Sequence, residues 1–169
     1  MNLFRSTASL LTDTGWLCLE SEGGVITRAW FSDEAVKEGD ADPVLINAMQ
    51  QLQEYLTGKR IVFDLPLQPA GTVFQQKVWK ALMEVKCGTT YSYKEFSARI
   101  SDAKSVRAVA TAIGANPVAV LIPCHRIIGS QGNLTGYAWG IYRKEWLLHL
   151  EQGAYTPSLF EQDKQSLHG

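Results

Sequence analysis

The sequence is poor in cysteine and has no long hydrophobic run. Cys18, Cys87 and Cys124 are an odd number of cysteines at wide spacing, which fits neither a disulfide framework nor a zinc site of paired cysteines. No stretch approaches the roughly 18 to 20 consecutive apolar residues of a membrane span, and residues 1–11 lack the basic start and cleavage site of a secretory signal. We therefore expect a cytoplasmic protein with free thiols, no membrane association and no metal site.

The net charge is also small, −1 over 169 residues, but the charges are unevenly distributed. Residues 1–70 hold five Lys and Arg against ten Asp and Glu, whereas residues 71–152 hold ten against five. A basic second part is typical of a surface that faces a polyanion such as nucleic acid. The alternative is that the acidic and basic parts attract each other.

The hydrophobic fraction of 46% is enough for a core in one ordinary domain or two very small ones. In the first part, the strand-like runs 16–21 and 25–31 flank Gly23-Gly24, a pattern typical of a hairpin. Pro43 then begins a helical pattern of apolar residues that ends before Gly58. These patterns predict a small antiparallel sheet with one helix covering a face.

Between residues 66 and 71, prolines and a glycine coincide with the change in charge, which predicts a domain boundary. Directly after it, Thr72 and Gln75 have the spacing of a capping box. Apolar residues follow at helical spacing as far as Cys87-Gly88. We therefore expect a helix that begins at Thr72 and ends near Cys87-Gly88.

Two shorter helices are predicted next. Ser92 and Glu95 form a second capping-box pattern, and after a break at residues 101–102 the segment 105–116 is helical in pattern. Two short helices joined by a tight turn are the outline of a helix-turn-helix, which many proteins that do not bind DNA also have.

The segment 105–116 has two different faces. Its apolar face is formed by Val106, Val109 and Ile113. Its other face has little bulk and is formed by Ala108, Thr111, Ala112 and Ala115, with Arg107 as the one long side chain near the start. Such a face can lie against a groove of DNA and insert the guanidinium, or it can pack tightly against a neighbouring helix.

A candidate nucleophile follows the apolar run 118–122. There the chain continues as Pro123-Cys124-His125-Arg126. The thiolate is the reactive form of cysteine, and neighbouring His and Arg side chains lower the pKa of a thiol. We therefore expect Cys124 to be activated by His125 and Arg126, although a Cys-His pair by itself is more often incidental.

Longer strings make the pattern specific. Pro123-Cys124-His125-Arg126-Ile127-Ile128 is followed by Gly136-Tyr137 and then by Arg143-Lys144-Glu145-Trp146-Leu147-Leu148. Over residues 71–152 the chain resembles the O6-alkylguanine-DNA alkyltransferase family. The resemblance implies an α/β (α+β) protein with three parts: a ribonuclease H-like domain over 1–70, a mostly helical DNA-binding and alkyl-acceptor domain with a helix-turn-helix over 71–152, and a polar tail over 153–169.

The resemblance also implies roles for individual residues. Cys124 would accept the alkyl group, His125 would deprotonate it through a water, and Glu151 would orient the imidazole, as in a catalytic triad with sulfur as nucleophile. Asn116 would tie the turn before the active-site segment. Tyr93 would donate a proton or a hydrogen bond to the guanine as it leaves.

DNA contacts follow from the same resemblance. Arg107 would enter the base stack in place of a flipped nucleotide, and the small residues Ala108 and Thr111 would press on the minor groove. Arg126 and Tyr93 are further expected DNA contacts. We expect a monomer that binds double-stranded DNA carrying O6-alkylguanine, acts once per molecule and needs no cofactor, with O4-methylthymine left open as a second substrate.

Two aromatic residues are expected to line the base pocket, Tyr137 and Trp139. Many relatives carry a small residue where this chain has Trp139, so its indole is expected to narrow the space beside Cys124. The alternative is that Trp139 turns outward or packs against Trp146 or the N-terminal domain.

Three other functions compete with alkyl transfer. A DNA-binding regulator would leave Cys124 and His125 idle, and a lesion-binding relative without activity would lack the acceptor cysteine. A cysteine hydrolase would have no use for Arg107 on a helix of small residues.

Overall fold

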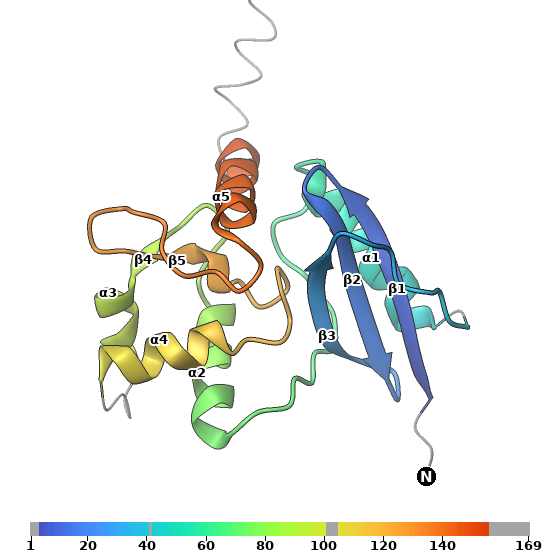
Figure 1. The fold of residues 1–169 in the computed structure, drawn as a ribbon, viewed down its shortest axis with the longest axis horizontal. Coiled ribbons are helices and arrows are strands. Elements are labelled where there is room, and N and C mark those ends of the chain that lie inside the picture. The colour runs from blue at the N-terminus through green and yellow to red at the C-terminus, as the bar shows by residue number, and fades with distance from the viewer. Residues whose placement is uncertain (1–3, 41, 101–104, 156–169) are drawn as a thin grey trace, which may run out of the picture.

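The computed structural model describes residues 4–40, 42–100 and 105–155. In chain order the elements are β1 (Arg5–Thr12), β2 (Gly15–Glu22), β3 (Val25–Ser32), α1 (Pro43–Leu56), α2 (Val73–Met83), β4 (Tyr91–Ser92), α3 (Tyr93–Ser97), α4 (Val106–Gly114), η1 (Cys124–Arg126), β5 (Ile127–Ile128) and α5 (Ile141–Tyr155). Figure 1 shows two halves, a three-stranded sheet with α1 against one face and a group of helices formed by the rest of the chain. The expected mixture of a small antiparallel sheet and helices is confirmed.

The N-terminal sheet is antiparallel in the order β1-β2-β3. The predicted hairpin is confirmed, with Glu22 paired to Val25 and positive φ angles of 60° at Gly23 and 83° at Gly24. Glycine adopts such angles without steric cost, so the turn can be this tight. β1 was not predicted, because its first residues are small and polar and carry no clear alternation.

Helix α1 begins and ends where the sequence predicts. Asp42 caps its N-terminus by accepting a hydrogen bond from the Val44 amide at 3.0 Å, and the same carboxylate accepts one from the Ser21 hydroxyl of β2. Gly58, with a φ of 75°, lets the chain turn away after the last helical turn. The cap therefore both starts α1 and anchors it to the sheet.

The outer edge of β3 is covered by two segments from later in the chain. Ile26 exchanges backbone hydrogen bonds with Pro66 and Gln68, at 2.9 and 2.8 Å. Ala29 exchanges two more with residues 117 and 119, at 3.0 and 2.9 Å. We propose the stretch 66–71 as the domain boundary, and its first residues pair with the edge of the sheet as a short extra strand would.

Helix α2 has the predicted capping box between Thr72 and Gln75, but it ends at Met83 rather than near Cys87-Gly88. The amide of Glu84 bonds back to the carbonyls of Ala81 and Leu82, which tightens and closes the last turn. Val85 still packs in the core, so the apolar spacing continued past the end of the helix.

The second capping box, between Ser92 and Glu95, is confirmed at α3. The predicted break at 101–102 lies outside the described residues, as do residues 156–169 of the predicted tail. Residues 153–155, which were also assigned to the tail, belong to α5.

Helix α4 differs from the prediction in which residues it buries. Val109, Ala112 and Ile113 face the core, whereas Val106 is 42% exposed. The Trp79 indole donates a hydrogen bond to the Ala112 carbonyl at 2.8 Å, so α2 lies close against this turn of α4. The small side chain of Ala112 permits that approach. Val106 lies in the first turn of α4, outside the contact with α2, and is therefore exposed.

Within the described ranges, no helix is long and apolar enough to cross a membrane, and no three His, Cys, Asp or Glu side chains lie together as a metal would require.

Candidate active site

The segment before Cys124 is held in a fixed path by Asn116. The Asn116 amide nitrogen donates to the carbonyls of Val118 and Ile122, at 3.3 and 2.9 Å, and its oxygen accepts from the Val118 amide at 2.9 Å. The side chains of residues 118–122 are buried, and Val120 has a left-handed φ of 69°. A side-chain amide with both a donor and an acceptor closes this irregular turn and so fixes where η1 begins.

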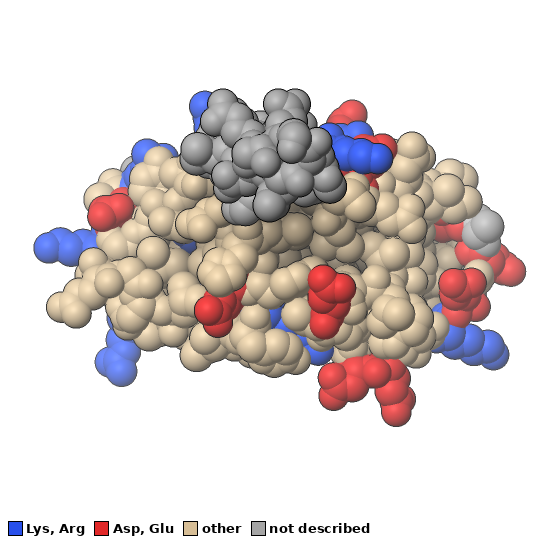
Figure 2. Space-filling view, turned by 90° about the horizontal axis from the view of Figure 1, so that it is seen from above, with Lys and Arg blue, Asp and Glu red and all other residues tan. Residues whose placement is uncertain are grey.

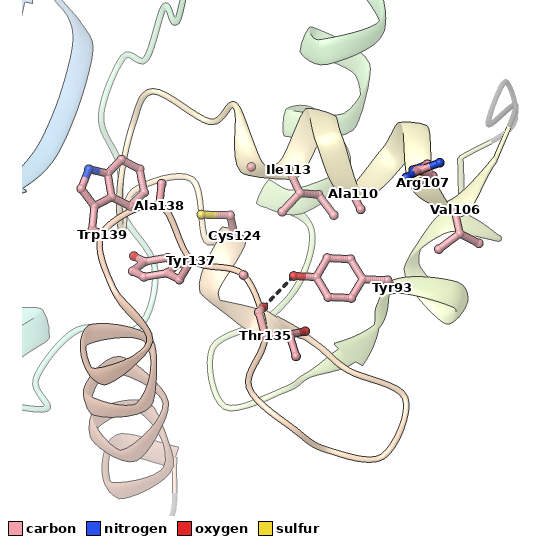
Figure 3. A pocket seen from close by; sticks show the side chains of 12 residues that line it. Tyr93, Val106, Arg107, Ala110, Ile113, Cys124, Thr135, Tyr137, Ala138 and Trp139 are labelled. Atoms are coloured by element: carbon pink, nitrogen blue, oxygen red, sulfur yellow. Dashed lines mark hydrogen bonds between the residues drawn. The ribbon is translucent and has the colours of Figure 1, made fainter.

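Cys124 lies at the floor of a cavity of about 860 Å³. The cavity walls come from α3, the outer side of α4 and the loop 135–139. Figure 3 shows the Cys124 side chain between the loop that carries Tyr137 and Ala138 and the helix that carries Ala110 and Ile113. The thiol is only 5% exposed, yet it faces open space.

Burial raises the pKa of the Cys124 thiol to about 11, and the neighbouring Asn116 amide and Lys144 ammonium offset only part of this effect. The expectation that His125 and Arg126 lower this pKa was therefore wrong. A thiol with this pKa is protonated at neutral pH, so a nearby base has to remove its proton before it can attack.

His125, the next residue in the chain, is the candidate for that base. Its ring is fully buried, and Nε2 lies 2.6 Å from Glu151 Oε1. Although burial raises the pKa of Glu151, His125 and Arg126 hold it well below its usual range, so Oε1 is an anionic acceptor and Nε2 carries the proton. Nδ1 then has a free lone pair, and among the described residues it has no hydrogen-bond partner.

Arg126 is buried, which does not fit the DNA contact expected from the sequence. Its side chain is buried, with Nε and Nη2 on the Glu151 carboxylate at 2.8–3.2 Å and Nη1 on the Val85 carbonyl at 2.6 Å. A guanidinium bound in this way supports the carboxylate and cannot reach a phosphate. The guanidinium also neutralises Glu151, which makes a buried negative charge tolerable.

Two buried polar residues of the site were missed in the sequence, Lys144 and Tyr55. The Lys144 ammonium donates to the Thr135 carbonyl at 3.0 Å, and burial lowers its pKa to about 8. Lys144, Leu147 and Glu151 are all essentially unexposed. Their spacing of three and four residues marks one buried stripe of α5, and a lysine on such a stripe was the signal available in the sequence.

Tyr93 and Arg107 both line the cavity, as the resemblance implies. The Tyr93 hydroxyl donates to the Thr135 carbonyl at 3.1 Å, and the short pairing of β4 with β5 fixes the start of α3 beside the end of η1. Arg107 is exposed near the start of α4, at the far end of the helix from Cys124 (Figure 3). Ala110, not Ala108 or Thr111, faces the cavity, so these last two remain expected DNA contacts on the outer part of α4.

The two halves of the chain correspond to two known domain types. Residues 12–69 match the model of the 6-O-methylguanine DNA methyltransferase ribonuclease-like domain, and residues 73–153 match that of the DNA binding domain of the same enzyme. A methylated-DNA--protein-cysteine methyltransferase from Mycobacterium tuberculosis is 41% identical over 143 residues, 82% of this chain and 87% of that relative. The chain belongs to the 6-O-methylguanine DNA methyltransferase family.

Other members of the family are similar as well. The protein of the same description from Methanosarcina mazei is 52% identical over 102 residues, which cover 60% of this chain and 65% of that relative, just under two thirds of its length. A crystal structure of Mycobacterium tuberculosis OGT in complex with DNA superposes with a TM-score of 0.78 at 39% identity, covering 88% of this chain and 93% of that one.

In this member of the methyltransferase family, Trp139 both lines the cavity and packs on the N-terminal sheet. Its ring centroid lies 5.3 Å from that of Tyr137 and 6.5 Å from that of Phe31 on β3. The Trp139 carbonyl accepts a hydrogen bond from Arg143 at 3.2 Å, and Arg143 also binds the Thr14 carbonyl at 2.8 Å. Trp139 therefore combines the two alternatives, a place in the pocket wall and packing against the N-terminal domain. The sheet holds the indole at the wall of the cavity.

Replacing Trp139 with glycine is expected to speed reaction with O6-benzylguanine and to change reaction with O6-methylguanine in DNA little. Overfilling a closed site costs about 1–3 kcal/mol, so the gain on the benzyl compound should be roughly 5- to 150-fold. Single-turnover rates on both substrates measure it. Trp146→Phe is the control, because Trp146 also packs on Phe31 but does not line the cavity. Equal changes on both substrates would show that Trp139 does not limit the space.

Proposed function

We propose that this chain repairs DNA by direct reversal of damage, transferring the alkyl group of O6-methylguanine to its own Cys124. The observation that carries the proposal is a thiol at the floor of an open cavity, next to a buried His125–Glu151 pair whose free Nδ1 can accept a proton. This arrangement fits acceptance of an alkyl group and needs no metal or cofactor.

The proposed reaction balances with the groups present. His125 Nδ1 takes the Cys124 proton through a water, and the sulfur attacks the alkyl carbon as its bond to O6 breaks. The electron pair of that bond stays with the guanine, and Tyr93 donates a hydrogen bond to the base as it gains negative charge, its hydroxyl turning from the Thr135 carbonyl to do so. The guanine then takes up one proton from water, which replaces the proton that His125 removed and later releases. A thioether is stable, and no group in the cavity regenerates the thiol, so each molecule acts once.

The lesion must leave the base stack to reach Cys124. A stacked O6-alkyl group cannot approach a thiol at the floor of a cavity, whereas an extruded base can, and a damaged pair costs less to open. The cavity of about 860 Å³ is large enough for one base, and α4 borders its mouth. We infer that the outer face of α4 enters the minor groove and that Arg107 fills the vacated space.

The charge distribution supports this orientation on DNA. Residues 71–152 hold ten Lys and Arg against five Asp and Glu, and the excess is reversed in residues 1–70. On the face that Figure 2 views, most acidic side chains lie toward the half with the three-stranded sheet, while basic side chains project at both ends. Binding of one copy of the chain through the half formed by residues 71–152 would keep most of the acidic side chains away from the phosphates.

The mass of the intact protein tests the function. After incubation with a duplex oligonucleotide that carries one O6-methylguanine, the protein should gain the mass of one methylene, since a methyl group replaces the thiol proton. The gain should stop at one equivalent of lesion per protein. A regulator or a hydrolase would leave the mass unchanged, and that result would overturn the proposal.

Arg107→Ala is expected to slow repair in duplex DNA while leaving attack on free O6-benzylguanine nearly unchanged. Stacking on a base is worth about 1–3 kcal/mol, so the loss on duplex should be roughly 5- to 150-fold. Arg99→Ala is the charge-matched control, because Arg99 is exposed but its guanidinium stacks over Tyr91 instead of lining the cavity. If Arg107→Ala slowed both reactions equally, a role in base flipping would be excluded.

A further inference from the structure

The Glu151 carboxylate receives a hydrogen bond from the opposite half of the chain. Tyr55 lies on α1, is 1% exposed, and donates from its hydroxyl to Glu151 Oε1 at 2.7 Å. The two residues are 96 positions apart in the sequence. The Tyr55 ring packs against Phe63 at a centroid distance of 5.2 Å, which holds the hydroxyl in place.

Tyr55 and His125 bind the same oxygen of Glu151. Oε1 accepts from His125 Nε2 at 2.6 Å, from Tyr55 at 2.7 Å and from Arg126 Nη2 at 2.8 Å, whereas Oε2 accepts from Arg126 Nε at 3.0 Å. Burial, followed by the charge of Glu151, raises the pKa of Tyr55 well above its ordinary range, so its hydroxyl remains a donor throughout the working pH range.

Tyr55 is not needed merely to satisfy Glu151. Without it, Oε1 would still accept bonds from His125 and Arg126, and a phenylalanine would fill nearly the same volume. The hydroxyl instead competes with the His125 N–H for electron density on one oxygen. A carboxylate that accepts more hydrogen bonds is a weaker base, so it stabilises a protonated imidazole less.

We propose that Tyr55 is a positioning residue through which the N-terminal domain sets the proton affinity of the His125–Glu151 pair. The inference rests on the proposed function, in which His125 accepts the Cys124 proton. Among the described residues, the other titratable or charged groups near Glu151 are Arg126, from η1, the Cys87 thiol, from the turn after α2, and the Tyr137 hydroxyl, from the loop before α5. None of them changes when only the Tyr55 hydroxyl is removed.

Tyr55→Phe in the full chain tests the proposal through the pH dependence of methyl transfer. Without the hydroxyl, Oε1 becomes a stronger acceptor for His125 and the protonated imidazole is stabilised. Since the imidazole must be neutral to accept a proton, the acid limb of the rate profile should move to higher pH. A move of about 0.5–1 pH unit corresponds to roughly a two- to fivefold slower rate at the pH where the parent is half active.

Tyr91→Phe is the matched control, because its hydroxyl accepts a hydrogen bond from Arg99 and does not touch Glu151. Its profile should coincide with that of the parent. Thermal melting of each variant confirms that the fold is kept. An unmoved acid limb in Tyr55→Phe, or a loss of rate that is equal at every pH, would overturn the proposal and leave the proposed function standing. A parent that transfers no methyl group at any pH would overturn both.

Discussion

Cys124→Ser is expected to abolish alkyl transfer while binding to undamaged DNA stays close to that of the parent. A serine hydroxyl keeps its proton at neutral pH even more firmly than the buried thiol, whose pKa is about 11, and it is a weaker nucleophile toward carbon. The substitution changes one atom at the floor of the cavity and leaves the outer face of α4 intact. Intact-protein mass measures transfer, and a gel-shift titration measures binding.

Alkylation of one of the other two cysteines would contradict this prediction. Cys18 and Cys87 are buried and do not line the cavity of Cys124. Burial raises the pKa of both thiols, that of Cys87 to about 11. An alkylated peptide that contains either residue, or residual transfer by Cys124→Ser, would show that Cys124 is not the acceptor.

Glu151→Gln is expected to lose both stability and activity. A neutral amide leaves the buried Arg126 guanidinium without its anion, and breaking such a pair lowers the free energy of unfolding by about 3–5 kcal/mol. The amide also no longer fixes the tautomer of His125, for which a loss of transfer rate of about 10²- to 10⁴-fold is expected. Urea unfolding and single-turnover rates measure the two effects.

Glu145→Gln is the matched control for this substitution, because Glu145 is exposed on the same helix, α5. It should change neither quantity appreciably. If Glu151→Gln were as stable and as active as Glu145→Gln, the Arg126–Glu151–His125 cluster could not be the support of the site.

The loss of stability in Glu151→Gln has a defined pH dependence. Arg126 and His125 hold the pKa of Glu151 well below its usual range, so its stabilisation is fully present above about pH 4.3, the ordinary value for glutamate. Below that pH the stabilisation declines progressively until the pH reaches the lowered pKa. The difference in unfolding free energy between parent and variant should therefore be constant from neutral pH to about pH 5 and should narrow progressively at lower pH.

Local patterns predicted much of the fold. Capping boxes at Thr72 and Ser92, the glycine pair of the hairpin and the proline at the start of α1 each depend on neighbours within a few residues. For the same reason the short string around Cys124 was enough to indicate the candidate nucleophile.

Other features depend on residues that are distant in the sequence. Whether Arg126 points to solvent or inward is decided by Glu151, 25 positions later, and the contact of Tyr55 with Glu151 spans 96 positions. The raised pKa of Cys124 reflects burial, and the neighbouring residues in the sequence do not show how deeply a side chain is buried. Trp139 likewise could not be assigned to the cavity or to the sheet from its own loop, because Phe31 of β3 determines its position.

The cover on the outer edge of β3 affects how the chain can be made. Translation releases β1, β2 and β3 from the ribosome long before residues 117–119 exist, so the peptide groups of Ala29 that will pair with them are unpaired in the nascent chain. An unpaired strand edge can form backbone hydrogen bonds with a strand of another molecule. The active-site segment, synthesised later, closes that edge while it positions Cys124. Formation of the turn before Cys124 therefore also pairs this part of the sheet edge, while residues 66–68 pair the part at Ile26.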